Sequence, residues 1–347
     1  MNSLDYAPKN ARAFRGFVEG VRKLNAYLES NVGGQLTEAE QYLSQAIDSD
    51  PEFLPAQYYK SIVLTHERKS DDAIRLLEHL LRKNPPFRTE ILYNLAFAYA
   101  KKYKYESLTK SVELVAMALD AAKVQKRTDL ILLLSAIQAW IFAVFAGRDY
   151  KHLDDFDKRR HEYLPRAVSI ANSVLKDARL SELPSDTKAA ISVEAHNAAG
   201  IAFMRIGQFG SLFPEQKDSA WRLASEHYLA ALSVHSHDVR VLDNISTLRL
   251  LEASRAIREG HTHDAATLAA DARACALEAI SLNPGDRFRH YRRAQAEYLL
   301  GDLEGVHEAA RAALDQPGEV NEQKIRALLN SRSIEDPSLV LNEYPTD

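Results

Sequence analysis

Four of the chain's twelve histidines lie in two near-identical tetrapeptides, HSHD at residues 235–238 and HTHD at 261–264. Imidazole is the commonest metal ligand in proteins, and carboxylates bind metals as well. Each tetrapeptide could therefore supply part of a metal site, and the two together could supply a complete one. The alternative is two unrelated turns, and the segment between the motifs decides between these hypotheses.

That segment predicts a long helix. Residues 239–259 contain neither glycine nor proline and carry apolar residues at helical spacing. A helix of about 20 residues is roughly 30 Å long, whereas zinc ligands lie about 2 Å from the metal. The two motifs therefore cannot share one ion. Asp238 and Asp264 instead stand where helix N-caps belong, and either motif alone could still bind a metal.

The composition is that of a folded protein without a disulfide framework. The 347 residues are 46% hydrophobic and 27% charged, and the net charge of −4 gives no general attraction to nucleic acid. The single cysteine, Cys275, suits a reducing cytoplasm, and its alanine-rich surroundings predict a buried, inert thiol. Residues 130–147 lack any charge and just reach membrane-spanning length, but the amphipathic helices predicted on both sides favour a buried central helix.

An internal period of 34 residues organises the chain. The segment TEAEQYLSQAIDSDPEF (37–53) matches DDAIRLLEHLLRKNPPF (71–87). The matched positions are Ala39 with Ala73, Leu43 with Leu77, and Pro51 with Pro85. Near the other end, Pro284 and Pro317 lie 33 residues apart. Proline ends a helix because it has no N–H to donate, so the period predicts repeated helical units.

These residues resemble the tetratricopeptide repeat (TPR), a pair of antiparallel helices with small residues at the helix contacts. YNLAFAY (93–99), NAAGIAF (197–203) and RAQAEYLLGD (293–302) match its first helix. The resemblance implies an all-α fold, an α-solenoid in which about seven antiparallel helix pairs form a right-handed superhelix. The predicted pairs span 12–51, 54–85, 88–123, 129–178, 187–236, 238–284 and 287–317, and a last helix near 320–332 caps the apolar end.

The expected organisation is one TPR-like solenoid, residues 12–333, between an N-terminal extension (1–11) and a flexible C-terminal tail (334–347). The repeat pattern is strongest at 35–100 and 190–315 and diverges at 105–185. Close packing of neighbouring helices requires small side chains at their contacts. The positions predicted to provide them are Ala39, Ala73, Ala96, Gly200 and Ala231.

The resemblance also implies a peptide-binding groove on the concave side, lined by the first helix of each pair. An asparagine amide can both donate to and accept from an extended peptide backbone. The candidate partner-binding residues are Asn94, Asn197 and Asn244, the aromatic Tyr58, Phe97 and Phe203, and the charged Arg292 and Arg293. The two arginines could bind a carboxylate or phosphate, or could pair with acidic residues of the preceding repeat. Local capping or packing is the alternative for the asparagines.

Two insertions interrupt the compact repeat, at 148–164 and 208–221. Insertions in solenoids often bind partners. The second insertion carries Phe209 and Phe213, whose rings could equally fold back onto a neighbouring helix.

Common catalytic motifs (HExxH, GxSxG, the phosphate-binding GxxxxGK[ST], GxGxxG and CxxC) do not occur in the sequence. We therefore expect a non-enzymatic cytoplasmic adaptor or scaffold without a cofactor, whose partner is a protein or peptide, which could be acidic, rather than nucleic acid or a membrane. One alternative is a regulator that responds to a peptide or ligand and acts on an effector chain. The other is a metal-dependent all-α hydrolase of the HD type, which needs further His and Asp ligands around its dyad.

Overall fold

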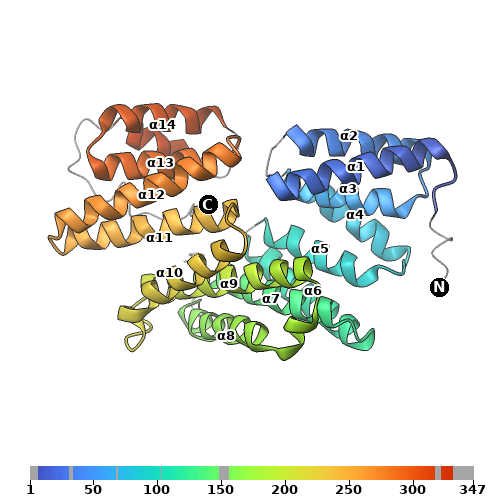
Figure 1. Cartoon of the computed structure of the whole chain (residues 1–347), viewed down its shortest axis with the longest axis horizontal. Coiled ribbons are helices and arrows are strands. Elements are labelled where there is room, and N and C mark those ends of the chain that lie inside the picture. The colour runs from blue at the N-terminus through green and yellow to red at the C-terminus, as the bar shows by residue number, and fades with distance from the viewer. Residues whose placement is uncertain are drawn as a thin grey trace. The chain divides into compact units, whose positions relative to one another are not determined.

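The computed structural model describes residues 7–30, 34–67, 69–102, 104–147, 156–316 and 322–330. Over these ranges the chain folds into α-helices with one short 3-10 helix, η2 (Ala178–Glu182), and without a β-strand (Figure 1). The contacts divide the chain into two compact units. Unit 1 comprises Met1–Ile141 with Ala178–Leu183, and unit 2 comprises Phe142–Asp177 with Pro184–Asp347.

Unit 1 holds three complete helix pairs and most of a further helix. These are α1 (Ala11–Ser30) with α2 (Gly34–Ser49), α3 (Leu54–His66) with α4 (Ser70–Arg82), α5 (Arg88–Ala100) with α6 (Tyr105–Val124), and α7 (Thr128–Gly147) as far as Ile141. Besides packing on its partner, each first helix also contacts the first helix of the next pair, α1 on α3 and α3 on α5.

Unit 2 continues the same arrangement from the last turn of α7. Its helices are α8 (Phe156–Lys176), α9 (Ser185–Gln208), α10 (Lys217–Val234), α11 (Val239–Arg258), α12 (Thr262–Leu282), α13 (Arg287–Leu300), α14 (Leu303–Asp315) and α15 (Glu322–Leu329). α15 packs against α13 and α14, so it takes the place of the next first helix and covers their apolar edge.

Every predicted pair corresponds to two consecutive helices, and the capping helix near 320–332 is α15. The all-α architecture of seven antiparallel pairs and a terminal helix is therefore confirmed, and the described parts of the divergent region 105–185 are mainly helical as well. The predicted domain limits at 11 and 334 stay predictions. Much of the extension and all of the tail lie outside the described residues.

Antiparallel packing depends on the predicted small residues, all of which are buried. In α9, a Cβ added to Gly200 would lie 2.4 Å from the Tyr228 ring, and one added to Gly207 would lie 2.3 Å from the Trp221 ring. The contacts run in opposite sequence directions along α9 and α10, as antiparallel helices require. Glycine is thus needed at these two positions because the second helix approaches the backbone of the first.

The uncharged segment 130–147 forms most of α7, which is long and apolar enough to cross a membrane by length and composition alone. Two thirds of its most apolar window is nevertheless buried within the protein. The aromatic rings of its last turns pack on α8, where the Phe142 and Tyr163 rings stack with their centroids 5.1 Å apart. These contacts agree with the prediction of a central packed helix.

Candidate functional site

One surface of unit 1 is built from aromatic rings on successive first helices. We call it the aromatic face, and it consists of Phe17, Tyr58, Tyr59, His66, Tyr93, Phe97 and Trp140, all half-buried. Rings meet across each helix boundary: Phe17 and Tyr59 lie 5.5 Å apart, His66 and Phe97 6.3 Å, and Phe97 and Trp140 5.5 Å. Ring contacts therefore join α1 to α3, α3 to α5 and α5 to α7.

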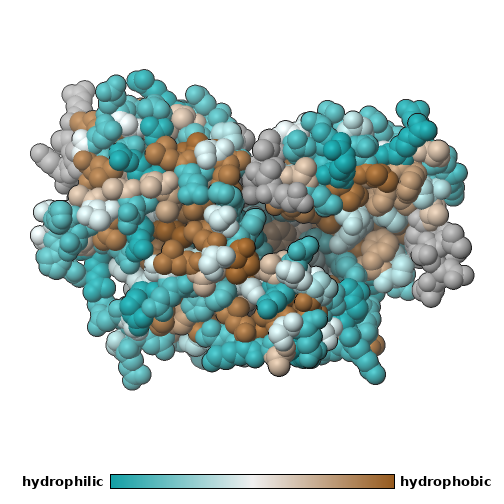
Figure 2. Space-filling model, in the orientation of Figure 1, coloured by the Kyte–Doolittle hydropathy of each residue, from teal (hydrophilic) through white to brown (hydrophobic). Residues whose placement is uncertain are grey.

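Helical periodicity explains why these rings share a face. Tyr93 and Phe97 are four residues apart on α5, so they lie one above the other, with ring centroids 6.5 Å apart. Ala96 lies on another side of the same helix, where its carbonyl accepts a hydrogen bond from the Ser111 hydroxyl of α6. The small residue thus faces the second helix and leaves the rings half-exposed. Figure 2 shows apolar side chains in bands between hydrophilic helix faces.

Exposed apolar residues of α1 extend the aromatic face. Phe14 is 53% exposed and Val18 is 43% exposed, and they flank Phe17 at helical spacing. Single exposed apolar residues are ordinary on protein surfaces, whereas a patch continuous with several half-exposed rings indicates an interaction surface.

Asn94 joins two of the first helices beside this surface. Its Nδ2 donates to the Tyr58 hydroxyl at 2.7 Å and to the Glu90 carbonyl at 3.0 Å, and no described residue donates to its Oδ1. Burial, with the nearby Tyr93 and Glu90, holds the pKa of Tyr58 well above its usual value, so the phenol stays protonated. The structure therefore brings the predicted residues Tyr58, Asn94 and Phe97 together on one face.

The other two predicted asparagines pair with each other in unit 2. Asn244 of α11 donates through Nδ2 to Oδ1 of Asn197 on α9, at 2.8 Å. Asn197 is buried, with 2% of its surface exposed. The pair links consecutive first helices, as the bond between Tyr58 and Asn94 does in unit 1. Phe203 lies elsewhere on α9, where it stacks on His227 of α10 with centroids 5.6 Å apart.

Neither predicted arginine is a free surface charge. Arg293 donates from its two terminal nitrogens to the Glu308 carboxylate of α14, at 3.0 and 3.1 Å, and so it links the two helices of its own pair. Arg292 is 2% exposed, lies over the Phe288 ring and donates to Oε1 of Gln295 at 2.8 Å. Its predicted role in partner capture stays a prediction, although burial makes it hard for a partner to reach.

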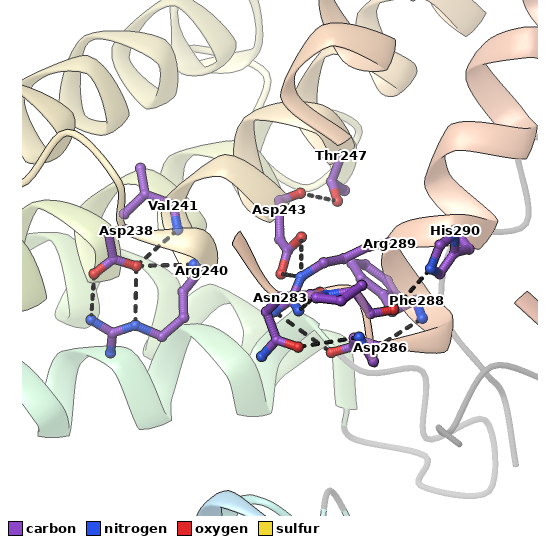
Figure 3. Close-up of polar contacts among 12 residues, drawn as sticks. Asp238, Arg240, Val241, Asp243, Thr247, Asn283, Asp286, Phe288, Arg289 and His290 are labelled. Atoms are coloured by element: carbon purple, nitrogen blue, oxygen red, sulfur yellow. Dashed lines mark hydrogen bonds and ion pairs between the residues drawn. The ribbon is translucent and has the colours of Figure 1, made fainter. Parts of the chain in front are cut away.

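A polar network between α11 and α13 accompanies these arginines (Figure 3). Arg289 donates from Nε to both oxygens of Asp243 at 3.2 Å, and from Nη1 to the Asn283 carbonyl at 2.9 Å. Burial raises the pKa of Asp243 to about 7, against the opposing effect of Arg289. Asp286 caps α13 by accepting from the Phe288 amide. Polar contacts therefore join α11 to α13, beside the apolar cluster that contains Leu250 and Tyr291.

The two histidine motifs lie at opposite ends of α11, as predicted. Asp238 caps α11 by accepting from the backbone N–H groups of Arg240 and Val241, and it also pairs with the Arg240 guanidinium (Figure 3). The same prediction was wrong for Asp264. The helix α12 begins at Thr262, so Asp264 lies inside the first turn. There its negative charge interacts favourably with the positive end of the helix dipole.

The described parts of the two insertions pack on each other. The Arg160 guanidinium of α8 lies 4.7 Å from the Phe156 ring and 4.1 Å from the Phe209 ring, and the His161 ring lies 4.8 Å from the Phe213 ring. Of the two hypotheses for Phe209 and Phe213, packing onto a neighbouring helix is therefore the one observed. Residues 148–155 of the first insertion lie outside the described residues.

Several residues of interest were absent from the sequence-based set. Tyr59, Tyr93 and Trp140 belong to the aromatic face. Tyr93 could have been found from the sequence, because it lies three positions before Ala96, the small residue at the helix contact. His196 and His227 form a close imidazole pair, with their Nδ1 atoms 3.0 Å apart. They are 31 residues apart on two helices, so no local motif marks them.

No family model matches the chain, and no curated protein matches it significantly. Among solved structures it is similar to an IFIT1 monomeric mutant with Gppp-AAAA, at 15% identity and a TM-score of 0.40, covering 89% of this chain and 71% of that one. It is also similar to the TPR2AB domain of yeast Sti1 in complex with pHSP90, at 14% identity and a TM-score of 0.27 over 91% and 96% of the two chains. The TPR domain of P58(IPK) gives 16% identity and a TM-score of 0.27 over 97% and 100%.

At these identities and TM-scores the neighbours carry no argument about partners. The fold is visible in the chain itself, as consecutive antiparallel helix pairs, small residues at the helix contacts, and first helices that touch the first helix of the next pair. The chain has a TPR-like fold of antiparallel helix pairs.

Proposed function

We propose that this protein is a non-enzymatic cytoplasmic adaptor, and that a segment of a partner protein binds on the aromatic face of unit 1. The observation that carries the proposal is the set of half-buried rings that meet between α1 and α3, between α3 and α5, and between α5 and α7. Aromatic side chains supply much of the affinity at protein interfaces because they bury a large area with few rotatable bonds.

The polar groups beside the rings define what kind of segment fits. Asn94 is largely buried, with 7% of its surface exposed, and Oδ1 is the atom that would accept a hydrogen bond from a peptide N–H while Nδ2 stays bonded to Tyr58. Lys101 lies 5.1 Å from the centre of the Phe97 ring, which places a positive charge at the edge of the face. An extended segment with apolar or aromatic side chains fits the rings and can donate a backbone N–H to Oδ1 of Asn94.

The arginines originally considered as anchors add little to this proposal. Arg293 is engaged by Glu308, and Arg292 is buried. The acidic character expected of the partner therefore stays a prediction. A regulator that changes shape on peptide binding stays a second hypothesis, which small-angle scattering with and without peptide would address. The hydrolase alternative would need His237 and Asp238 as its first metal-binding dyad. The Asp238 carboxylate instead caps α11 and pairs with Arg240.

The test uses two variants of the same helix. A random-peptide display library is selected on the wild-type chain, and the dissociation constant of the best labelled peptide is measured by fluorescence anisotropy. We expect Phe97→Ala to weaken binding about tenfold or more, which corresponds to ~1.4 kcal/mol. Tyr99→Ala is the matched control, because Tyr99 is a half-buried aromatic on another side of α5 that donates to Glu78 of α4.

We expect Tyr99→Ala to bind within about twofold of the wild type, a change of only ~0.4 kcal/mol. Circular dichroism of both variants confirms that they are folded. Selected peptides that bind Phe97→Ala as tightly as the wild type would show that the aromatic face is not the binding surface.

A further inference from the structure

Two imidazoles converge between α9 and α10 in unit 2. Nδ1 of His196 lies 3.0 Å from Nδ1 of His227, and both side chains are half-buried. The rings are inclined at 50° with centroids 5.2 Å apart, so they are not stacked face to face, and their Nδ1 atoms lie within hydrogen-bonding distance.

Packing of the two helices holds this geometry. His196, Gly200 and Phe203 recur at i, i+4 and i+7, so they lie on the same side of α9. Gly200 lets α10 approach so closely that an added Cβ would touch the Tyr228 ring at 2.4 Å. Phe203 stacks on the His227 ring at an angle of 20° and fixes its plane. The imidazoles are therefore positioned by rigid elements rather than by loops.

The imidazole tautomer decides whether Nδ1 can bind a metal. In the metal-free protein one Nδ1–H donates to the other Nδ1, and a change of tautomer to Nε2–H frees both Nδ1 lone pairs without releasing a proton.

We propose that His196 and His227 are the two protein ligands of a divalent transition-metal site that joins α9 to α10, with water or a partner's side chain in the remaining positions. For metal–nitrogen distances of 2.0–2.1 Å, two nitrogens 3.0 Å apart subtend an angle of about 94° at the metal. That angle fits neighbouring positions of a tetragonal or octahedral ion.

The same geometry selects among metals. A tetrahedral angle requires the nitrogens to lie about 3.3 Å apart, so Zn²⁺ would need the pair to open by about 0.3 Å. Cu²⁺ and Ni²⁺ accept the tetragonal angle directly, and Cu²⁺ binds nitrogen ligands more strongly than the other divalent ions of the series. We therefore expect Cu²⁺ to bind most tightly, followed by Ni²⁺ and then Zn²⁺.

The experiment must separate this pair from the exposed HSHD and HTHD motifs. A background variant replaces His235, His237, His261 and His263 with Gln, and all four side chains are exposed, so the fold should tolerate the change. Titration of this background with Cu²⁺, followed by pulsed electron paramagnetic resonance, should show one ion coupled to two imidazoles. The ion should also raise the thermal unfolding midpoint.

Adding His227→Gln to the background should weaken Cu²⁺ binding by about tenfold or more and abolish the stabilisation, and His196→Gln should do the same from the other helix. The melting curve of each variant without metal shows whether it folds. Because the two substitutions lie on different helices, either variant still tests the site if the other does not fold. A background protein that binds no Cu²⁺, or a signal from two imidazoles that survives His227→Gln, would overturn the proposal.

Discussion

Gly200→Ala probes the close helix approach on which the pairs depend. An alanine Cβ at this position would lie 2.4, 2.6 and 2.9 Å from Cε1, Cδ1 and Cζ of Tyr228. Carbon atoms in favourable contact lie about 3.5–4.0 Å apart, so α10 or the ring must move by about 1 Å. Tyr228 is fully buried and its hydroxyl contacts the Met204 sulfur, so the ring has little freedom to rotate away.

The magnitude follows from two opposing effects. Overpacking a buried contact costs ~1–3 kcal/mol, whereas replacing glycine with alanine inside a helix gains ~0.5–1 kcal/mol. We expect a net loss of about 1–2 kcal/mol in the free energy of unfolding, measured by urea denaturation with the unfolding of each unit fitted separately. The double variant Gly200→Ala with Tyr228→Leu should lose less than the sum of the two single changes.

Gly34→Ala is the matched control, because a Cβ there meets no atom within 4 Å. We expect it to change stability by less than about 0.5 kcal/mol. A Gly200→Ala chain as stable as the wild type would refute the close approach of α9 and α10, and with it the positioning of His196 beside His227.

Further changes test the caps, the histidine pair and the thiol. Asp238→Ala should cost about 1 kcal/mol in a denaturation series because α11 loses its N-cap, whereas Asp264→Ala should cost only a few tenths. The folded-state pKa of His196 is lowered from 6.5 to about 4, and that of His227 is also lowered, so the folded chain binds fewer protons than the unfolded chain. The contribution of the two histidines to the free energy of unfolding should therefore be fully present above pH 6.5 and be lost as the pH drops toward 4. A pH series in which the stability of His196→Gln falls as much as that of the wild type would contradict this. Burial raises the pKa of Cys275 from 9.0 to about 11, so native Cys275 should react with iodoacetamide at pH 8 about a hundredfold more slowly than in urea; equal rates would contradict the burial.

The helix pairs could be predicted because they follow from local periodicity. Alanine and glycine at matched positions of the repeat mark where helices touch, and this pattern survives in a single sequence. Caps were predicted less well, as Asp264 shows. The helix α12 begins at Thr262, three residues before the position that an Asp264 cap predicts, because the residues before Ala265 tolerate helical geometry.

Side-chain partners could not be predicted, because they depend on contacts between helices. Arg293 has its partner Glu308 fifteen residues away on α14, and His196 has His227 on α10. Both pairings depend on how each of two packed helices is rotated about its own axis. The spacing of apolar residues in the sequence determines that rotation only roughly. The same limit explains why Phe203 lies against His227 rather than beside Asn197.

The most direct measurement places a photo-crosslinking amino acid, benzoylphenylalanine, at Phe14 on α1 or at Val124 on α6, with the selected peptide bound. Both positions are exposed, at 53% and 84%, but Phe14 adjoins the aromatic face whereas Val124 ends a second helix. We expect the peptide to crosslink at position 14 and not at position 124. Crosslinking at position 124 alone would contradict binding of a partner segment on the aromatic face.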